Sequence, residues 1–556
     1  MIYCYMNLFK RRQPLMMEYI KMNLPAMNSF ASDYIKGSIN KSFAEYDWKN
    51  EKHIQDRADW LDGRTYPRDE MATYIESFMS KYGISEQVKE NIDALREDAL
   101  VIVGGQQAGL LTGPLYSIHK VISIIKLAKE QSERLNKRVV PIFWIAGEDH
   151  DYQEINHVYA EEGHETKKIV YPEKPLSKKM ISDINMNPDI AKDWLQDVFS
   201  LWGETERTNE LLDWAEKAID QSETITDFFA ILINDLFKMH GLLMVDSGDP
   251  GFRKLAGPVY QQIAYEAGIS KAVIEQQNLL KKNGYNPIID LDEQCTNLFY
   301  YEPSTLNRLL LEREEGSSDL IGKGSGIKLS QIELDRLLSK HPEYFSTNVV
   351  SRPLLQEKLF PVLGFIAGPG EIAYWSEIKP AFAMTGEKMP PIWPRLSFTL
   401  LEGNIERLLE ELNLPLEKVL RKGCSEDREF YLEELRKQAP DTYSSIIKNL
   451  ESAHLTWQQK AVEFDKGLEP LFEKNRHLIK EQLLFMQKKV ESHLERKNEE
   501  TIAKYNRVEN SLHPAGGLQE RILNPFYFFN QYGTLWVDCL LAESLEFDGS
   551  HYVVTI

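Results

Sequence analysis

ALVIVGGQQAGLLTGPLYSIHK, residues 99–120, opens with a short apolar run, passes through a glycine-rich loop and ends in an amphipathic helical pattern. A buried strand that leads through a loop into a helix is the repeating unit of a parallel sheet covered by helices. Four more apolar runs of this kind lie at 139–145, 242–246, 361–367 and 391–395. The sequence therefore predicts a doubly wound α/β fold whose parallel sheet holds these five strands.

Two intervals between these strands are too long for simple crossovers. The second and third runs are separated by about 95 residues, and the third and fourth by more than 100. The first interval holds helical patterns at 190–202, 207–221 and 224–240. The second holds helical patterns at 252–283 and 329–339, a strand-like segment at 297–302 and a glycine- and serine-rich turn at 316–326. We therefore expect two insertions into the sheet.

Beyond Arg395 the sequence changes to charged helices, with a break at Pro440. Apolar side chains then recur in steps of four and three, interrupted by His454, at Tyr443, Ile447, Leu450, Trp457, Ala461 and Phe464. After Gly467 and Pro470, a second stripe has apolar side chains eleven positions apart, at Phe472, Leu483, Leu494 and Tyr505. Such spacings are typical of helices that pack along one face. We expect an antiparallel hairpin with a nearly straight return arm of about 40 residues, completed within the chain or, as we favour, by a second copy in a homodimer.

The composition bounds the function. With 556 residues, of which 42 % are apolar, the chain has material for several globular domains. Its 85 acidic and 65 basic residues give a net charge of −20, which repels a phosphate backbone, so we expect no nucleic acid among its partners. No apolar run approaches the ~18 residues that span a bilayer, so we expect no membrane segment.

The cysteines and the first residues predict a cytoplasmic location. The four cysteines lie more than 100 residues apart, at Cys4, Cys295, Cys424 and Cys539. This spacing disfavours disulfides and structural zinc, and we predict no metal site within the chain. Residues 1–16 lack the cleavage site of a secretory signal, so we expect a disordered leader ahead of a start at Met16 or Met17.

The loop after the first strand offers groups that suit an anion. Ligands of open parallel sheets bind at the carboxyl ends of the strands, where loops and helix N-termini converge. The candidate ligand-binding residues here are Gly104, Gly105, Gln106, Gln107, His119 and Lys120. The loop matches neither the Walker motif nor G-x-G-x-x-G. It is either a cradle for phosphate or carboxylate or a tight turn without a ligand.

The second strand is followed by three carboxylates and an imidazole, at Glu148, Asp149, His150 and Asp151. Like charges at this density raise one another's pKa, which is typical of functional sites. The carboxylates could hold a substrate ammonium, or a Mg²⁺ that carries nucleotide phosphates. Alternatively, Asp149 or His150 removes a proton from an attacking amine. The competing interpretation is a solvated acidic loop in which His150 caps a helix.

Later strand ends and helix starts add substrate-binding candidates at Ser247, Asn348, Arg352, Glu371, Tyr374 and Arg395. The two arginines could each grip a carboxylate or phosphate through two hydrogen bonds. The structural alternatives are an N-cap for Ser247, helix-start and core roles for Glu371 and Tyr374, and a buried ion pair between the arginines and the acidic loop. The sequence lacks the G-x-S-x-G and H-E-x-x-H motifs and a cysteine nucleophile in a loop at a strand end.

A second binding surface is predicted in the aromatic-rich segment 519–533. Rings and polar groups that could stack on an adenine and hydrogen-bond to it lie at Arg521, Asn524, Tyr527, Asn530 and Tyr532. Packing of this segment against the core is the alternative use.

Taken in order, these motifs resemble one family. GGQQAGLLTGPLYSIHK, VPIFWIAGEDHD with EINHVY, SGDPG, RPLLQE with FIAGPGEIAYW, KMPPIWPR, the helical hairpin and QERI are similar to the cysteine ligases of bacillithiol biosynthesis, the BshC family. The resemblance implies a Rossmann-like core with two inserted connecting peptides, a C-terminal α-helical coiled-coil domain and a dimer. It also implies the addition of L-cysteine to glucosaminyl-malate. The implied domains are a core at 17–160, 241–290 and 346–400, connecting peptides at 161–240 and 291–345, a coiled coil at 401–510 and a C-terminal segment at 511–556.

Forming an amide in water requires an activated acyl donor, so ATP or another nucleotide, with Mg²⁺, is a candidate activator. The HIGH and KMSKS boxes of aminoacyl-tRNA synthetases are absent, so this expectation comes from chemistry and not from residues. We expect Asp149 and His150 to take a proton from the sugar ammonium, while Lys120, Arg352 and Arg395 bind malate or nucleotide oxygens. The alternatives are a non-catalytic helical scaffold with a vestigial nucleotide-binding core, and a nucleotide-dependent acyl or nucleotidyl transferase of other specificity.

Overall fold

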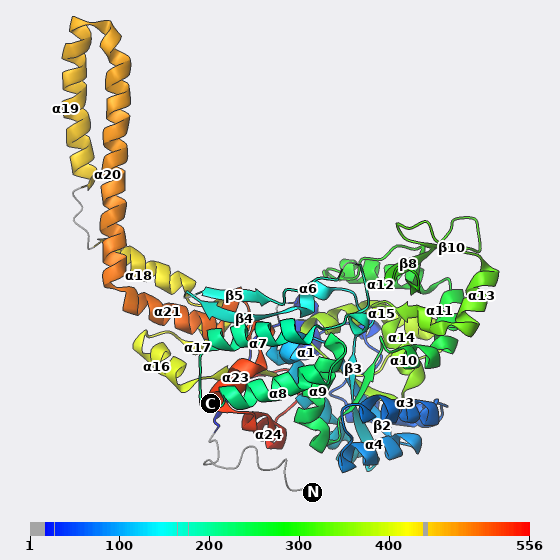
Figure 1. Cartoon of the computed structure of the whole chain (residues 1–556). Coiled ribbons are helices and arrows are strands. Elements are labelled where there is room, and N and C mark those ends of the chain that lie inside the picture. The colour runs from blue at the N-terminus through cyan, green and yellow to red at the C-terminus, as the bar shows by residue number, and fades with distance from the viewer. Residues whose placement is uncertain (1–16, 27, 164, 176, 438–442) are drawn as a thin grey trace. The chain divides into compact units, whose positions relative to one another are not determined.

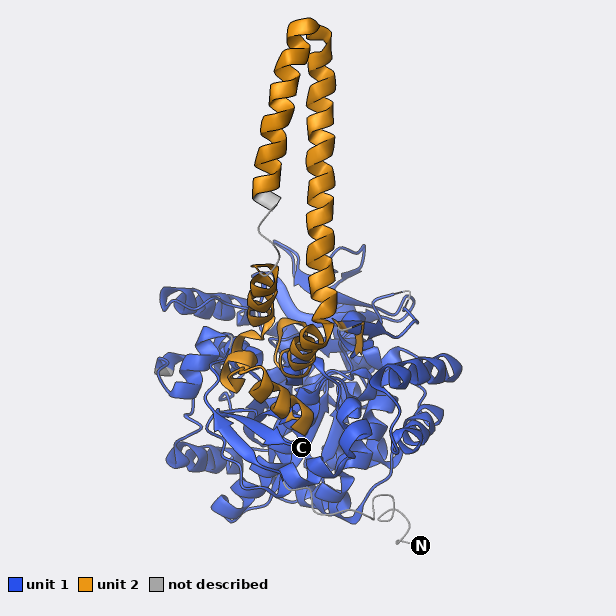
Figure 2. Cartoon of the chain, turned by 90° about the vertical axis from the view of Figure 1, so that its left-hand side faces the viewer, with its two compact units in different colours: residues 1–160, 167–400, 519–556 blue, residues 161–166, 401–518 orange. Residues whose placement is uncertain are grey.

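The computed structural model describes residues 17–26, 28–163, 165–175, 177–437 and 443–556 (Figure 1). The predicted leader and the predicted break at Pro440 lie outside the described residues. The chain divides into two compact units (Figure 2). Unit 1 contains residues 1–160, 167–400 and 519–556, and unit 2 contains residues 161–166 and 401–518.

The five predicted strands form one sheet of unit 1, in the order β13-β12-β2-β3-β6, and every neighbouring pair is parallel. They are β2 (Leu100–Gln106), β3 (Val139–Ile145), β6 (Leu243–Asp246), β12 (Val362–Ala367) and β13 (Ile392–Pro394). The chain builds outward from β2 through β3 to β6 and then returns to the other side of β2 with β12. This reversal confirms the predicted doubly wound α/β class and places the ligand-binding crevice beside β2.

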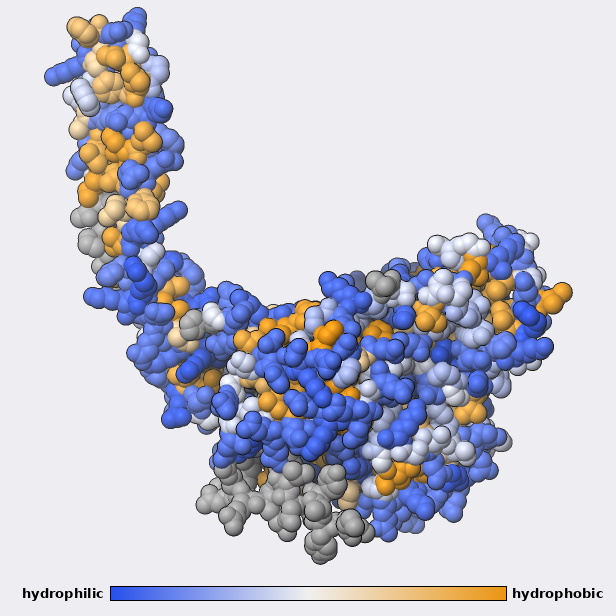
Figure 3. Space-filling model, viewed as in Figure 1, coloured by the Kyte–Doolittle hydropathy of each residue, from blue (hydrophilic) through white to orange (hydrophobic). Residues whose placement is uncertain are grey.

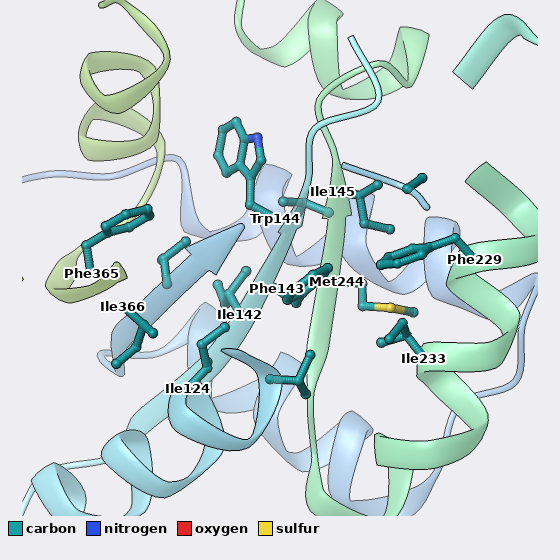
Figure 4. Packing of buried hydrophobic residues seen from close by; sticks show 14 of the residues in the cluster. Ile124, Ile142, Phe143, Trp144, Ile145, Phe229, Ile233, Met244, Phe365 and Ile366 are labelled. Carbon is teal, nitrogen blue, oxygen red and sulfur yellow. The ribbon is translucent and has the colours of Figure 1, made fainter. Parts of the chain in front are cut away.

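Apolar side chains cover both faces of this sheet. Phe143 of β3 stacks on Phe229 of α9 (Ile225–Phe237), with ring centroids 5.9 Å apart (Figure 4). Met244 of β6 and Ile233 of α9 lie in the same layer (Figure 4). The other helices of the N-terminal half and the sheet are α1 (Ser29–Lys36), α2 (Glu51–Asp62), α3 (Arg68–Ser80), α4 (Glu86–Arg96), α5 (Leu115–Leu135), α14 (Arg352–Leu359) and α15 (Pro369–Met384).

The first insertion contains the predicted helices. They are α7 (Pro188–Trp202), α8 (Thr208–Asp220) and α9. The sequence did not predict the short helix α6 (Tyr152–Ile155) or the strands β4 (His157–Glu162) and β5 (Glu165–Val170). These strands carry several charged, exposed side chains, so no apolar run marks them.

The second insertion is an antiparallel sheet in the order β10-β9-β8-β7-β11. Its strands are β7 (Cys295–Glu302), β8 (Asn307–Arg313), β9 (Leu320–Gly322), β10 (Lys328–Leu329) and β11 (Phe345–Thr347). Helices α10 (Pro250–Leu255), α11 (Gly257–Tyr265), α12 (Ile269–Lys282) and α13 (Gln331–Lys340) accompany it. Only β7 was predicted among these strands, because the others are very short or, as in β8, lack an apolar alternation.

A third sheet, in the order β1-β15-β14, ties distant parts of the chain together. Its strands are β1 (Tyr19–Met22), β14 (Ser397–Leu401) and β15 (His551–Thr555). The segment before β15 contributes α22 (Gln519–Ile522), α23 (Pro525–Tyr532) and α24 (Leu535–Ala542) to unit 1. The C-terminal residues are therefore part of the same unit as the parallel sheet.

Unit 2 is helical and contains the predicted hairpin. Its helices are α16 (Gly403–Glu411), α17 (Leu416–Lys422), α18 (Ser425–Lys437), α19 (Tyr443–Phe464), α20 (Glu469–Lys497) and α21 (Glu499–Leu512). α19 and α20 pack as an antiparallel pair (Figures 1 and 2). The return arm is not one helix, however, because it ends at Lys497 and resumes at Glu499. Asn498 leaves helical geometry there, where its side chain accepts a hydrogen bond from Tyr431 at 3.1 Å.

The predicted seam of α19 is only partly right. His454, which interrupts the apolar pattern, is buried and lies 3.0 Å from Asn475 of α20. Trp457 and Phe464, which were predicted to lie in the seam, are 64 % and 91 % exposed. Apolar side chains therefore reach the surface along the hairpin, as Figure 3 shows. Among the described residues, no helix combines the length and apolar character that crossing a membrane requires.

Candidate active site

A cavity of about 1030 Å³ opens at the carboxyl ends of β2, β3, β12 and β13. Strands β7 and β8 of the inserted sheet form part of its wall. Most of the predicted site residues line it: Gly105, Gln106, Gln107, Lys120, Glu148, Asp149, His150, Asn348, Arg352, Glu371, Tyr374, Arg395 and Arg521. Two groups of charged side chains in this lining carry opposite sign, and we name them the cationic end (Lys120, Arg352, Arg395, Arg521) and the acidic end (Glu148, Asp149).

At the cationic end, Lys120 on α5 is buried and paired. Its ammonium donates to Glu371 at 2.6 Å and to the carbonyl oxygen of Gly105 at 2.7 Å. Burial lowers the pKa of Lys120, although Glu371 opposes this effect. Glu371 in turn accepts from the backbone N–H of Gly368 at 2.8 Å and so caps α15. The predicted glycine loop and the predicted helix start therefore meet through one ion pair.

Arg395 is paired with Glu520, not with the acidic loop as the alternative interpretation had it. Two guanidinium nitrogens donate to the carboxylate of Glu520, at 2.7 and 2.9 Å. His119 lies 2.9 Å from the same carboxylate, and burial lowers the pKa of His119. Burial alone would raise the pKa of Glu520, but Arg395 and His119 hold it well below its ordinary value. The sequence interpretation missed Glu520, which sits in the QERI segment.

The other two cations have neutral neighbours. Arg352 donates to the hydroxyl of Tyr374 at 3.1 Å and to Gln356 at 3.2 Å. Arg521 is exposed at the cavity. Within the described part of the chain, neither arginine has a carboxylate at ion-pair distance. Four cations thus share two carboxylates, so the cationic end carries excess positive charge that suits an anion.

At the acidic end, Glu148 and Asp149 differ in their surroundings. Glu148 is buried and accepts a hydrogen bond from Ser247. Burial raises the pKa of Glu148, while Arg308 opposes the rise. Asp149 is partly exposed and accepts from the side-chain amide of Gln107 and from the backbone N–H of His150, both at 2.7 Å.

Arg308 of β8 is the cation that the sequence interpretation missed. Its guanidinium lies 3.8 Å from Asp149 and 3.2 Å from Nδ1 of His150. Its remaining nitrogens donate to Ser346 at 3.1 Å and to the carbonyl oxygen of Thr347 at 2.6 Å, so β11 fixes its position. Burial and Arg308 both lower the pKa of His150. Because a guanidinium only donates, Nδ1 accepts and the imidazole proton lies on Nε2.

The acidic loop packs closely against Ser182 and Asp246 at Gly147. Gly147 leaves no room for a side chain, because a Cβ atom there would overlap Ser182 and Asp246. Ser182 donates to Asp246 at 2.6 Å, and its backbone N–H donates to the carbonyl oxygen of Gly147 at 3.0 Å. Burial raises the pKa of Asp246 to about 7. The conformation of the loop therefore depends on β6 and on the start of the first insertion.

Comparison with known proteins identifies the family. Residues 17–396 match the domain described as "Bacillithiol biosynthesis BshC, N-terminal Rossmann-like domain". Residues 398–556 match "Bacillithiol biosynthesis BshC, C-terminal coiled-coil domain". The chain belongs to the BshC family.

Relatives within the BshC family match along the whole chain. A protein of Bacillus velezensis named "Putative cysteine ligase BshC" is 40 % identical, over 97 % of this chain and 100 % of that relative. A protein of the same name from a Geobacillus species is 39 % identical, with the same coverage. A solved structure described as a putative arginyl-tRNA synthetase from Campylobacter jejuni covers 88 % of this chain and 99 % of its own at 11 % identity, but its TM-score of 0.22 supports no argument.

Several predicted site residues of this BshC-family chain lie outside the cavity lining. Gly104 lies in β2, where a side chain would meet Ile124 of α5, so it permits close packing. His119 contacts Glu520, the partner of Arg395, and Ser247 donates to Glu148, so both act on lining residues and not on the cavity itself. Asp151 is exposed at the start of α6.

The aromatic segment uses its amide groups internally. The side chain of Asn524 donates to the carbonyl oxygens of Leu111 and Gly113, at 3.0 and 2.9 Å. Asn530 accepts from Thr208 at 2.8 Å. Tyr527 and Tyr532 are half-buried against the core. A separate nucleotide-binding surface here stays a prediction, and only Arg521 of the predicted group lines the cavity.

The cysteines and possible metal ligands of the described residues are as follows. Within them, no three histidine, cysteine or acidic side chains are grouped closely enough to hold a metal ion. The cysteines that the structure describes are free, and Cys295 and Cys424 are buried. Cys295 lines the cavity, but burial raises the pKa of its thiol, which disfavours a nucleophilic thiolate.

Proposed function

We propose that this protein is a ligase that joins the carboxyl group of L-cysteine to the amino group of glucosaminyl-malate, the last step of bacillithiol biosynthesis. The family membership and the relatives named as cysteine ligases support the reaction class. The observation that carries the proposal is one cavity with a cationic and an acidic end. One substrate of the proposed reaction is a dicarboxylate that bears an amine, and the other is an amino acid. The cavity must therefore offer both positive and negative charge.

The cationic end suits the malate carboxylates or nucleotide oxygens. Lys120 and Arg395 are held by Glu371 and Glu520, while Arg352 keeps hydrogen-bonding capacity for a ligand. The acidic end suits an ammonium, because Glu148 and Asp149 outnumber Arg308. We propose that the substrate spans the two ends, which would bring the amine to the acidic loop.

The amide forms when the amine nitrogen attacks the activated carbonyl carbon of cysteine. The nitrogen must first lose one proton to a base, and the sequence interpretation assigns this role to Asp149 and His150. As the carbon–nitrogen bond forms, the carbon–oxygen bond to the leaving group breaks, the leaving group takes the electron pair, and the nitrogen releases a second proton. ATP or another nucleotide is the candidate source of the activated acyl group.

The assay uses purified full-length protein with L-cysteine, glucosaminyl-malate, ATP and Mg²⁺, and mass spectrometry of the thiol products. We expect bacillithiol to form, and replacing ATP by other nucleotides identifies the activator. In cells, deletion of the gene should remove bacillithiol and accumulate glucosaminyl-malate. Unchanged thiols in the deletion strain would contradict the proposal and favour a scaffold.

The hairpin supports the homodimer as part of this proposal. Exposed apolar side chains recur every seven residues on each helix, at Leu450, Trp457 and Phe464 and at Leu471, Leu478 and Phe485. Leu450 lies beside His454 and Trp457 packs on Phe472 of α20, and the parts of these side chains that remain exposed are available to another chain. Light scattering should give a dimer mass for the full chain and a monomer mass for Trp457→Glu with Leu478→Glu. The control Lys460→Glu, at an exposed polar position, should remain a dimer.

A further inference from the structure

Glu148 and Ser247 form a buried pair at the acidic end of the cavity. The side chain of Glu148 lines the cavity, yet the residue is only 4 % exposed. Ser247, at the end of β6, is 2 % exposed, and its hydroxyl contacts the carboxylate. The same hydroxyl oxygen accepts from the indole N–H of Trp144 at 3.1 Å and lies 3.0 Å from the carbonyl oxygen of Ile145.

These contacts satisfy Glu148 in both protonation states. When the carboxylate is ionised, the single hydroxyl hydrogen of Ser247 points to it. When Glu148 holds a proton on the oxygen facing Ser247, it donates to the serine oxygen, whose own hydrogen turns to Ile145. When the proton lies on the other oxygen, Ser247 continues to donate as before, and the new O–H can donate to the neutral amine that released the proton. A buried carboxyl group can therefore gain or lose a proton here without leaving a polar atom unpaired.

We propose that Glu148, and not Asp149 or His150, accepts the proton that the substrate ammonium loses, with Ser247 as its positioning residue. This inference rests on the proposed function, because it requires an amine in the cavity. The carboxylate takes the proton, the electron pair of the N–H bond stays on nitrogen, and the products are a neutral amine and a neutral carboxyl group. Glu148 later returns the proton to solvent, so the residue ends as it began.

The hydrogen-bond partners of Asp149 and His150 differ from the Ser247 hydroxyl. Asp149 accepts from the side-chain amide of Gln107 and from a backbone N–H, and neither group can accept a hydrogen bond in return. The Nδ1 lone pair of His150 already accepts from Arg308, and its other ring nitrogen carries the proton. His150 therefore offers no unoccupied basic site, and among the described residues Asp149 has no partner that can both donate and accept as Ser247 does.

The charges around Glu148 come from several elements. Arg308 of β8 and the Ser247 hydroxyl favour the ionised form, whereas Asp149 on the same loop favours the neutral one. Asp246 at the end of β6 and Tyr260 of α11 are also within electrostatic range. Burial is the largest influence and raises the pKa of Glu148. A carboxylate with a raised pKa is a stronger base than an ordinary one, as this step requires.

The test is the pH dependence of kcat and kcat/KM for cysteine ligation by the full-length protein. Glu148→Gln keeps an oxygen for Ser247 and should lower kcat by ~10²- to 10⁴-fold. The acid limb of the profile, which is the fall in rate at low pH as the base is protonated, should be lost. The matched control Asp149→Asn makes the same change of charge one residue away. It should keep the acid limb and lose no more than about tenfold in kcat.

Ser247→Ala supplies a second test if Glu148→Gln does not fold. Removing the donor to ionised Glu148 raises its pKa, so the acid limb should move to higher pH by about one unit. Ser247→Thr keeps the hydroxyl and should restore the limb. An active wild type whose Glu148→Gln variant keeps its rate and profile, while Asp149→Asn loses them, overturns this inference and leaves the ligase proposal intact. A wild type without ligation activity under any nucleotide overturns both.

Discussion

Buried charges are fully paired at the cationic end of the cavity and incompletely paired at the acidic end. At the cationic end, the side chains of Arg395 and Glu520 are 6 % and 4 % exposed and form a two-bond ion pair, which favours the charged state of each. At the acidic end, Glu148 is equally buried but its carboxylate is met by a hydroxyl donor, a backbone N–H and a more distant cation, without a directly paired one in the part of the chain that the structure describes. Locked charges suit binding, since they do not change during a reaction, whereas an incompletely compensated carboxyl group suits proton transfer.

The largest expected effect comes from breaking the locked pair. Glu520→Gln leaves Arg395 buried without its counter-charge, which should lower the free energy of unfolding by about 3–5 kcal/mol. Urea denaturation of the purified protein measures this loss. The control is Glu546→Gln, which removes a carboxylate of the same segment that pairs with Lys21 at the surface. Exposed pairs contribute about 0–1 kcal/mol, so equal losses in the two variants would contradict the comparison.

Arg308 tests the acidic end. Arg308→Met removes the cation nearest the acidic loop, so the pKa of Glu148 should rise further. The pKa of His150 should also rise, because it loses a positive neighbour. The acid limb of the ligation profile should therefore move upward by about one pH unit or more. Arg308→Lys retains the charge and should move the limb less, and an unmoved limb in Arg308→Met would show that the cation does not tune this end.

Asp246, which packs against the acidic loop at Gly147, is a second buried carboxyl group without a paired cation among the described residues. Its pKa is raised from 3.8 to about 7 by burial, so at pH 5 the folded protein holds a proton that the unfolded chain has released. Stability contributed by this group is fully present below about pH 4 and is lost as the pH rises to about 7. Asp246→Asn should remove this fall, which is about 4 kcal/mol over the whole window and about 2–3 kcal/mol between pH 5 and pH 7.5.

Denaturation at pH 5 and pH 7.5 measures the difference between wild type and Asp246→Asn. Asp189→Asn is the control, because Asp189 is exposed in the first turn of α7 and its replacement should leave the fall with pH in place. If the free energies of unfolding of wild type and Asp246→Asn differ equally at both pH values, the carboxyl group of Asp246 does not change its protonation state over this range.

The smallest effect is expected for Arg521, the exposed cation of the cationic end. Arg521→Ala should raise the KM for glucosaminyl-malate by no more than about fivefold and leave kcat and stability unchanged, since one exposed charge contributes about 0–1 kcal/mol. The effect should shrink as salt is added. Arg336→Ala, on the exposed side of α13, is the control and should change neither constant. A fall in kcat for Arg521→Ala would place this residue closer to the reaction than its exposure indicates.

The sequence predicted the sheet and the loops that follow its strands because both are local. The runs at 99–103 and 139–145 carry their β-branched side chains in consecutive positions, and the groups that follow a parallel strand must lie at one edge. The family resemblance and the helical hairpin were likewise visible in contiguous motifs.

The partners of those groups were not predictable in the same way. Arg308 reaches the acidic loop only because β8 pairs with β7 in a sheet that has no strong pattern, and Glu520 is 125 residues from Arg395. The sequence left two uses open for Asn524, ligand binding or packing, and could not show that its amide donates to the carbonyl oxygen of Gly113. A sequence pattern marks which groups stand at strand ends, but not which distant groups complete their hydrogen bonds.

The return of residues 519–556 to unit 1 sets an order of events during synthesis. The ribosome delivers β2, α5 and Arg395 long before Glu520 and β15, which lies between β1 and β14. Until that segment emerges, the nascent chain holds Arg395 without its carboxylate and β1 without its neighbour. A chain released early therefore holds an uncompensated cation and exposes an open sheet edge, which can pair with a strand of another chain and start aggregation.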